Sequence, residues 1–235
     1  LVVCFVSGER MAFAIFSLAL LILFFLLQKH RFVILGSIIF GFMCIFTIYK
    51  LHPFYNDYKI IESTEFHQGL KIEKKFDCKE GSDKVCTKLI NVQPRFFDII
   101  KNFKTSAYGE IYLLSFKMFK DNPITGVGIN NFKQLCIKED KYQRMMVNYD
   151  CASHPHNTYI QWLTEGGITI FFLFILYLIY LFDLILKNVG DREYKIISFV
   201  ILLILFWPIM STGSLIKNWY GVSVFYIIGV CMCIS

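Results

Sequence analysis

The stretch Cys151-Ala-Ser-His-Pro-His-Asn-Thr-Tyr-Ile-Gln-Trp-Leu-Thr-Glu-Gly-Gly167 joins a polar loop to a long apolar run. Its first half holds two histidines, and its second half leads into residues 166–182, which carry no charge. An imidazole at the start of a membrane helix is costly to place there unless it has a role. The stretch therefore predicts a membrane protein with a candidate catalytic residue where a loop meets the bilayer.

Further apolar runs lie on both sides of this stretch. The chain has 235 residues, of which 56% are hydrophobic and 17% aromatic, and this is too apolar for an ordinary soluble domain. About 20 residues at a rise of about 1.5 Å each cross a bilayer. Five uncharged runs reach or approach that length: Met11–Gln28, Phe32–Tyr49, Gly166–Phe182, Ile196–Ile216 and Asn218–Ser235. We therefore expect an all-α polytopic membrane protein with about five full transmembrane helices and a truncated one.

The positions of the apolar runs predict three regions. Residues 1–51 hold transmembrane helices, the first of them truncated, because Leu1–Val6 reads as the end of an earlier span. Residues 52–157 form a large loop region, and residues 158–235 hold the remaining helices. The last run is still apolar where the sequence stops, so we expect a fragment of a larger protein. No basic segment with a cleavage site precedes these runs, so Leu1–Val6 is not a signal peptide.

The charges of the short loops predict the orientation. Lys29, Arg31, Lys187, Arg192 and Lys195 lie in two short loops, and short basic loops face the cytoplasm. The long loop region then lies on the outer side of the membrane. Its weakly basic balance suits anionic headgroups or phosphates and is far too weak to indicate nucleic acid binding.

Within the loop region, apolar residues recur at helical spacing over Ala107–Lys120, and Asp121-Asn-Pro123 is a helix-stop signal. We expect this helix to lie along the membrane surface. The mixed stretch Tyr58–Gln93 predicts irregular or weakly paired strands.

The eight cysteines fall into two groups. Cys4, Cys44, Cys231 and Cys233 lie in apolar runs, where cysteine behaves as a small hydrophobic residue. The loop region holds the other four, and an even number of cysteines in an oxidising compartment indicates disulfides. We favour the two local pairings Cys78–Cys86 and Cys136–Cys151, although four cysteines allow three pairing schemes. A zinc site is the rival interpretation, but no C-x-x-C pair is present.

The polar corner at residues 154–157 holds the first candidate site residues. Pro155 fixes the local backbone, and Asn157 is a suitable N-cap for the helix that follows. An imidazole titrates near pH 6.5, which suits His156 as a general base. His154 is a second candidate, and the alternative for both histidines is that they only satisfy loop carbonyls. The His-x-His spacing also fits a metal, but no carboxylate cluster lies near it in the sequence.

Several cations are candidates for binding a phosphate. Arg10 follows a tight turn, Ser7-Gly8-Glu9, on the same outer side as His156. A guanidinium there can hold a phosphate bidentately or simply reach the lipid headgroups. Arg95 and Lys133 also lie in the outer loop region. They either bind phosphate or are ordinary solvated surface residues. Gly126-Val-Gly128 is a weak motif alone, and a turn with positive φ explains it.

Taken together, these residues resemble the O-antigen ligase family. The family's D-x-P-x-x-G-x-G-x-x-x-F pattern matches Asp121–Phe132. Its His-Asn pair, followed after nine residues by Gly-x-x-Gly, matches His156-Asn157 and Gly167, with Ile170 in place of the second glycine. Its arginine in a small-residue turn matches Arg10. A second family arginine before the D-x-P pattern is absent from Ser106–Glu110, and Arg95 is the candidate substitute.

The resemblance implies an enzyme of the bacterial inner membrane, multi-pass, with its active site facing the periplasm. It implies inverting transfer, without a metal or other cofactor, of a glycan from undecaprenyl pyrophosphate to a sugar hydroxyl of the lipid A core. His156 would activate the acceptor hydroxyl and Arg10 would stabilise the leaving pyrophosphate. Arg95, Lys133, Asn157 and His154 would contact the substrates. The partners would be the lipid-linked glycans and the membrane lipids.

Other interpretations stay open at this point. An O-antigen or related polysaccharide polymerase uses the same kind of donor, and a protein O-glycan transferase is a third relative. A transporter or a non-catalytic membrane protein belongs to a different class. Transporters place polar, broken helices near mid-membrane. In this sequence Glu165 and Asp183 are near the ends of their apolar runs, which favours chemistry at the membrane surface.

Overall fold

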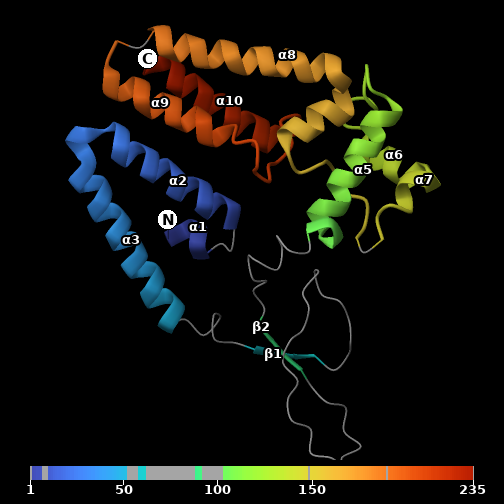
Figure 1. The fold of residues 1–235 in the computed structure, drawn as a ribbon, viewed down its shortest axis with the longest axis horizontal. Coiled ribbons are helices and arrows are strands. Elements are labelled where there is room, and N and C mark those ends of the chain that lie inside the picture. Colours follow the sequence, from blue (N-terminus) through green and yellow to red (C-terminus); the bar gives the residue numbers. More distant parts are fainter. Residues whose placement is uncertain are drawn as a thin grey trace, which may run out of the picture.

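The chain is mainly helical (Figure 1). This computed structural model describes residues 2–6, 10–51, 58–61, 88–91, 103–147, 149–188 and 190–234. The helices at the two ends of the chain are α1 (Val2–Val6), α2 (Arg10–Leu26), α3 (Arg31–Leu51), α8 (Thr158–Asn188), α9 (Arg192–Leu205) and α10 (Asn218–Cys233). The helices between them are α5 (Ala107–Asp121), α6 (Phe132–Lys138) and α7 (Asp140–Gln143), with single 3-10 turns at Gln28–His30 (η1) and Phe103–Thr105 (η3).

Two helical stretches are long and apolar enough to cross a membrane by length and composition. They are Gln28–Ile48 and Thr158–Lys187, and shorter apolar helices span Met11–Leu26 and Trp219–Cys233. The described residues therefore contain two of the predicted spans at full length. The total of about five and the side of the membrane on which the loop region lies stay predictions.

The apolar helices form two groups that meet along α2 and α9. α8, α9 and α10 share a core of buried side chains that includes Phe174, Leu202 and Val224. α2 packs against α9, and α3 packs back on α2 (Figure 1). His30 Nε2 lies 3.0 Å from Glu193 Oε2, which joins the end of α2 to the start of α9. The two helices are therefore antiparallel.

The predicted span Ile196–Ile216 is wrong as a single helix, because α9 ends at Leu205. Proline has no backbone N–H and disfavours helical backbone at the residue before it, so Pro208 stops the helix although the residues around it are apolar. Residues 206–217, which we call the connecting segment, instead run back to residues 154–158. We call residues 154–158 the corner from here on. Tyr159 donates its hydroxyl to the carbonyl of Phe206 at 2.6 Å, which satisfies one of the carbonyls at the end of α9.

A second difference concerns the helix that contains the apolar run Gly166–Phe182. The helix begins at Thr158, as the N-cap Asn157 predicted, but it is broken at Gly167, where φ is 65° and ψ is −170°. A short first segment, 158–166, therefore meets the long second segment at an angle, as Figure 1 shows at the right-hand end of α8. Glycine adopts this backbone conformation at little cost, whereas other residues do not.

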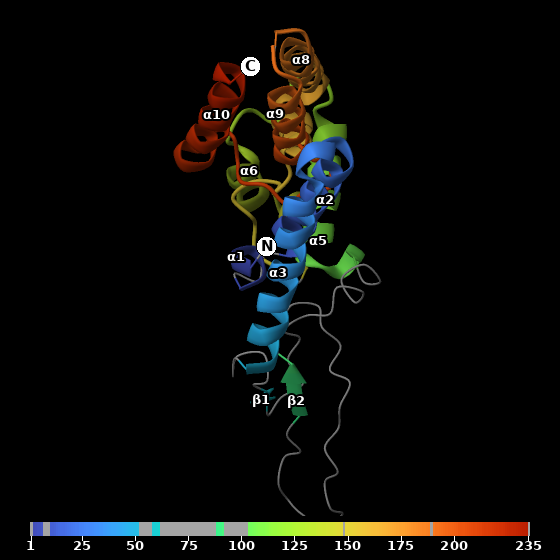
Figure 2. The same ribbon diagram turned by 90° about the vertical axis from the view of Figure 1, so that its left-hand side faces the viewer.

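The loop-region helices have a core of their own. Ile111, Leu114 and Met118 on one face of α5 pack against Phe132, Cys136 and Tyr142. Burying each of the larger apolar side chains contributes about 1.5–3 kcal/mol. α5 begins at Ala107, with the Ser106 hydroxyl accepting a hydrogen bond from the Gly109 N–H, and ends at Asp121. Both ends agree with the helix predicted for this stretch. Figure 2 shows α5 and α6 from the side.

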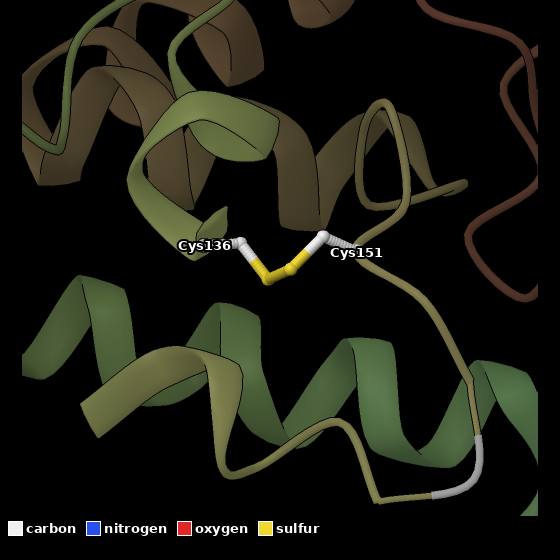
Figure 3. The surroundings of a disulfide bond; sticks show 2 residues. All are labelled: Cys136 and Cys151. Carbon is white, nitrogen blue, oxygen red and sulfur yellow. A yellow bond between two sulfur atoms is a disulfide. The ribbon is translucent and has the colours of Figure 1, made fainter. Parts of the chain in front are cut away.

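The predicted disulfide Cys136–Cys151 is present, with the two Cα atoms 5.9 Å apart (Figure 3). It ties α6 to the loop that leads into the 154–158 corner. Cys78 and Cys86 lie outside the described residues.

Two short strands, β1 (Tyr58–Ile61) and β2 (Lys88–Asn91), pair antiparallel with Tyr58 opposite Asn91. They confirm the weakly paired strands expected here and are the exception to the all-helical architecture in the described part of the chain.

Candidate functional site

The backbone of the 154–158 corner is held in an uncommon conformation at His156. Its φ is 55°, in the left-handed region, where histidine is more frequent than most residues other than glycine. The His156 carbonyl accepts a hydrogen bond from the Thr212 N–H at 2.8 Å. Pro155, before it, is fully buried. The connecting segment therefore fixes the direction in which the His156 side chain leaves the chain.

The imidazole of His156 lies between two other rings. The His154 ring centroid is 4.2 Å away, and the Tyr108 ring stands edge-on at 6.0 Å. Within the described residues, neither ring nitrogen of His156 has a hydrogen-bond partner, and the residue is half-buried. Burial lowers the pKa of His156, and the positive charge of Lys217 lowers it further. A neutral imidazole with a free nitrogen is therefore available at neutral pH.

His154 is bound differently. Its Nε2 lies 3.2 Å from the carbonyl oxygen of Thr212, which can only accept, so we assign the hydrogen to Nε2. Its Nδ1 then accepts from the Ser153 hydroxyl at 2.9 Å. Burial, followed by the charge of His156, lowers the pKa of His154 to about 4. Both nitrogens are thus used by the protein, and the ring supports His156 from one side.

Asn157 is the N-cap of α8, as its type and position predicted. Its Oδ1 accepts from the Ile160 N–H at 3.1 Å. Its Nδ2 donates to the carbonyls of Pro208 at 2.8 Å and Met210 at 3.1 Å. The side chain is buried, and it binds the connecting segment to the start of the helix. Any effect of Asn157 on a substrate would therefore pass through that segment.

A buried polar stripe continues from Asn157 along the first segment of α8. Thr158 and Thr212 join their hydroxyls at 2.9 Å. Gln161 Nε2 donates to Ser214 Oγ at 2.8 Å and to Glu165 Oε2 at 3.0 Å. The spacing of Asn157, Gln161 and Glu165, four residues apart, is the signal by which the sequence shows this stripe, because such residues share one helix face. The stripe is therefore a feature that the sequence-based prediction missed.

The D-x-P pattern docks on the break in α8. The Val127 N–H donates to the Thr164 carbonyl at 3.0 Å, and the Gly128 N–H donates to the Glu165 carbonyl at 3.0 Å. The N–H of Ile168 donates to the carbonyl of Pro123 at 2.9 Å. A Cβ on Gly126 would overlap backbone atoms of Glu165, and a Cβ on Gly167 would overlap backbone atoms of Ile124. Both glycines are therefore needed for close approach, which confirms the turn with positive φ and accounts for the pattern without a ligand.

Asp121 anchors the beginning of the same pattern. Its carboxylate accepts from Lys117 at 2.7 Å, from the Tyr142 hydroxyl at 2.8 Å and from Lys141 at 3.1 Å. The hydrogen bonds from Lys117 and Tyr142 lower the pKa of Asp121 to about 2. The carboxylate is thus ionised throughout the physiological range and ties α5 to α7.

The structure locates two of the three cations that the sequence analysis proposed for phosphate binding. The structure describes the backbone of Arg10 and not its side chain. Because α2 and α9 are antiparallel, Arg10 begins α2 at the end where α9 passes into the connecting segment. Arg95 lies outside the described residues. Lys133 is exposed on α6.

Lys217 is the last residue of the connecting segment, directly before α10. Among the described residues it is the cation whose charge lowers the pKa of both His154 and His156. No local pattern in the sequence indicates this proximity, because about 60 residues separate the corner from the start of α10.

An apolar cavity of about 310 Å³ lies close to the corner. It is bounded by both segments of α8, by α10 and by the connecting segment. Its lining includes Trp162, Phe174, Phe206, Leu215 and Val224. No group of three or more His, Cys, Asp or Glu side chains in the described part of the chain is placed to hold a metal ion.

The comparison with known families agrees with the motifs. The model of the O-antigen ligase family matches residues 1–175, which include Arg10, the D-x-P pattern and the His156-Asn157 pair. No curated protein and no solved structure matches the chain. The family match covers well over half of the sequence, and the two helical stretches able to span a membrane fit it. The chain is a membrane protein that belongs to the O-antigen ligase family.

Proposed function

We propose that the protein transfers a glycan from undecaprenyl pyrophosphate to a sugar hydroxyl of the lipid A core, at the periplasmic face of the bacterial inner membrane. Family membership supports glycan transfer in general. The observation that carries the finer proposal is the imidazole of His156, neutral and unpartnered among the described residues, at the start of an apolar helix. Such a group is suited to accept a proton from an acceptor hydroxyl.

The reaction needs one displacement step. His156 takes the proton of the acceptor hydroxyl as its oxygen bonds to the anomeric carbon of the donor. The bond from that carbon to the pyrophosphate oxygen breaks, and the pyrophosphate leaves with the electron pair. Attack from the face opposite the leaving group inverts the anomeric carbon. No metal is required, because the charge that develops on the leaving group can be stabilised by fixed cations.

Cations for the leaving group are present on more than one element. Arg10 is our first choice because it lies at the His156 end of α2. Lys217 is added to Arg95 and Lys133 as a candidate because its charge reaches the histidines. A guanidinium can hold two phosphate oxygens at once, whereas an ammonium acts as a point charge.

The apolar cavity beside the corner suits a hydrocarbon chain. Its lining is apolar apart from the polar edges of aromatic rings, and it adjoins the connecting segment. A polyprenyl chain there would lie along the apolar helices while its pyrophosphate stayed near the corner. This arrangement favours a lipid-linked donor over a soluble sugar nucleotide.

The test is complementation of a Gram-negative strain that lacks its own ligase. The full-length protein should restore glycan-capped lipopolysaccharide on a gel. His156→Asn should remove the capping, with a loss in rate of about 10²–10⁴-fold. Asparagine tolerates the left-handed backbone, so this variant isolates the loss of the ring.

His30→Asn is the matched control, because His30 lies at the far end of α2, and it should keep activity. Full capping by His156→Asn would contradict the role of the base. Lengthened lipid-linked glycan in place of capped lipopolysaccharide would identify a polymerase, and glycosylated protein would identify a protein O-glycan transferase.

A further inference from the structure

Four aromatic rings form a continuous row that ends at His156. Phe103 and Tyr112 have ring centroids 5.9 Å apart, and Tyr112 and Tyr108 are 6.4 Å apart. Tyr108 is then 6.0 Å from the His156 ring. These distances lie in the range of aromatic contacts. The row runs along the start of α5, from η3 to the corner.

Of the three rings that precede His156 in the row, Tyr112 packs against the core of the loop region, whereas Phe103 and Tyr108 are exposed outside it. The core face of α5 consists of Ile111, Leu114 and Met118, which are almost fully buried. Phe103 is 41% exposed and Tyr108 is 40% exposed. Large aromatic rings left open to solvent beside a reactive side chain are typical of a binding surface.

The row is held in place by contacts with the rest of the protein. The hydroxyl of Tyr108 accepts a hydrogen bond from the Ser211 hydroxyl at 3.2 Å. Tyr112 is held by packing against the core of the loop region, and burial, followed by the charge of Tyr108, raises its pKa. Tyr108 is therefore attached to the connecting segment and Tyr112 to the core. Their rings are ordered before any ligand arrives, which reduces the entropy cost of binding.

A pyranose ring has the complementary chemistry. Its C–H faces are apolar and lie flat on an aromatic ring, while its hydroxyls project from the rim toward polar partners. A lipid chain does not need the ordered hydroxyls, and α5 carries Lys117 and Lys120 on its exposed surface. A sugar stacked on Tyr108 would bring a hydroxyl to the free edge of His156.

We propose that Phe103, Tyr112 and Tyr108 form a stacking surface for the hexose rings of the acceptor glycan, ending at His156. The inference rests on the proposed function, because the acceptor is the substrate whose hydroxyl must reach the base. The donor sugar is joined to pyrophosphate and must approach the same point from the side of the cations. The aromatic row therefore selects the acceptor and contributes to its KM.

The first experiment measures binding without catalysis. Full-length protein carrying His156→Asn is purified in detergent and mixed with a core oligosaccharide released from lipopolysaccharide by mild acid. Saturation-transfer NMR then reports which sugar protons contact the protein. Tyr108→Leu and Phe103→Leu should each weaken binding by about three- to tenfold, whereas Tyr108→Phe should bind within about twofold of the parent.

Tyr194→Leu is the matched control, because Tyr194 is 51% exposed at the start of α9, far from the corner. It should leave binding unchanged. The proposal is overturned if the leucine variants of the row bind the oligosaccharide as the parent does. Phe103→Leu removes no hydrogen bond, so it keeps the test decisive if Tyr108→Leu fails to fold.

The second experiment separates the acceptor from the donor. In protein with His156 intact, Phe103→Leu should raise the KM for the acceptor by about three- to tenfold and leave the KM for the lipid-linked donor unchanged. A rise in the donor KM instead would overturn the assignment to the acceptor. Since the binding measurement uses an inactive variant, loss of the proposed function would leave its result standing.

Discussion

The two ends of the α2–α9 pair each contain a histidine, but the two histidines are held by different forces. At one end, His30 lies 3.0 Å from Glu193, and Lys29 approaches the same carboxylate at 3.8 Å. All three side chains are more than a third exposed. At the other end, His156 is half-buried, and the hydrogen bonds around it link backbone groups and neutral side chains.

The difference teaches how a reactive group is fixed in a membrane protein. Exposed ion pairs contribute about 0–1 kcal/mol, weaken with salt and hold their partners loosely. Neutral hydrogen bonds in a buried stripe are costly to break, because each orphaned group loses about 1–3 kcal/mol. The His30 end is thus suited to joining two helices, and the His156 end to holding one ring in a single position.

The largest effect should come from the break in α8. Gly167 has a positive φ, which strains alanine. In Gly167→Ala the new Cβ would also overlap backbone atoms of Ile124, which cannot move without shifting the chain. We expect a loss of about 4 kcal/mol or failure of the protein to accumulate. Thermal unfolding of the purified protein measures it. Gly229→Ala in α10 is the control, since a Cβ there meets nothing within 4 Å, and an equal loss in both variants would contradict the docking explanation.

The disulfide gives the next effect. Removing the bridge between Cys136 and Cys151, separated by 15 residues, should cost about 3 kcal/mol, because the unfolded chain regains the entropy of that loop. The double variant Cys136→Ala/Cys151→Ala should unfold at a lower temperature than the parent, and reductant should lower its midpoint by less than it lowers that of the parent. Cys233→Ala, at a free and exposed cysteine, is the matched control. A reductant effect in the double variant as large as that in the parent would contradict the stabilising role of this bridge.

The next prediction concerns the effect of Lys217 on the pH dependence of the proposed reaction. Its positive charge disfavours the imidazolium form and so lowers the pKa of His156. The base must be neutral, so the rate falls as the pH drops through that pKa, on the acid side of pH 6.5. Lys217→Met should raise the pKa and move this acid limb to higher pH by less than about one unit. Lys217→Arg keeps the charge and should leave the limb in place, and an identical limb in all three proteins would exclude the effect.

The smallest effect is expected at the other end. Glu193→Gln removes the charge that His30 and Lys29 approach, but all these groups are exposed. The cost should be below about 1 kcal/mol and should shrink further at high salt. Thermal unfolding at low and high salt measures it. A loss as large as that of the disulfide would mean that the two ends do not differ as described.

Much of this fold follows from local sequence rules. The apolar runs predicted the long helices, helical spacing predicted α5, and Asn157 was recognised as an N-cap. The disulfide between Cys136 and Cys151 also followed from spacing and compartment. Each of these features depends on residues close together in the chain.

The errors arose where distant segments decide the backbone. Residues 206–211 are mostly apolar and resemble a helix, but Pro208 prevents a helix and the amide of Asn157 binds the carbonyls of Pro208 and Met210, so they form turns instead. The break at Gly167 depends on the Pro123–Gly128 turn, about 40 residues earlier in the chain. At the candidate site, His156 was proposed because its own neighbours in the sequence are unusual, whereas Tyr108 and Lys217 come from other elements. Their types alone do not distinguish them from ordinary surface residues.

The connecting segment has a consequence for the order of events during synthesis. The connecting segment contributes Thr212, whose N–H binds the His156 carbonyl, and Ser214, which binds Gln161, and both residues are made only after α8 and α9. A chain that ends at residue 167 holds His154 and Tyr108, which flank His156, but it lacks Thr212. The backbone at His156 therefore gains the hydrogen bond from Thr212 only after α9 has been made.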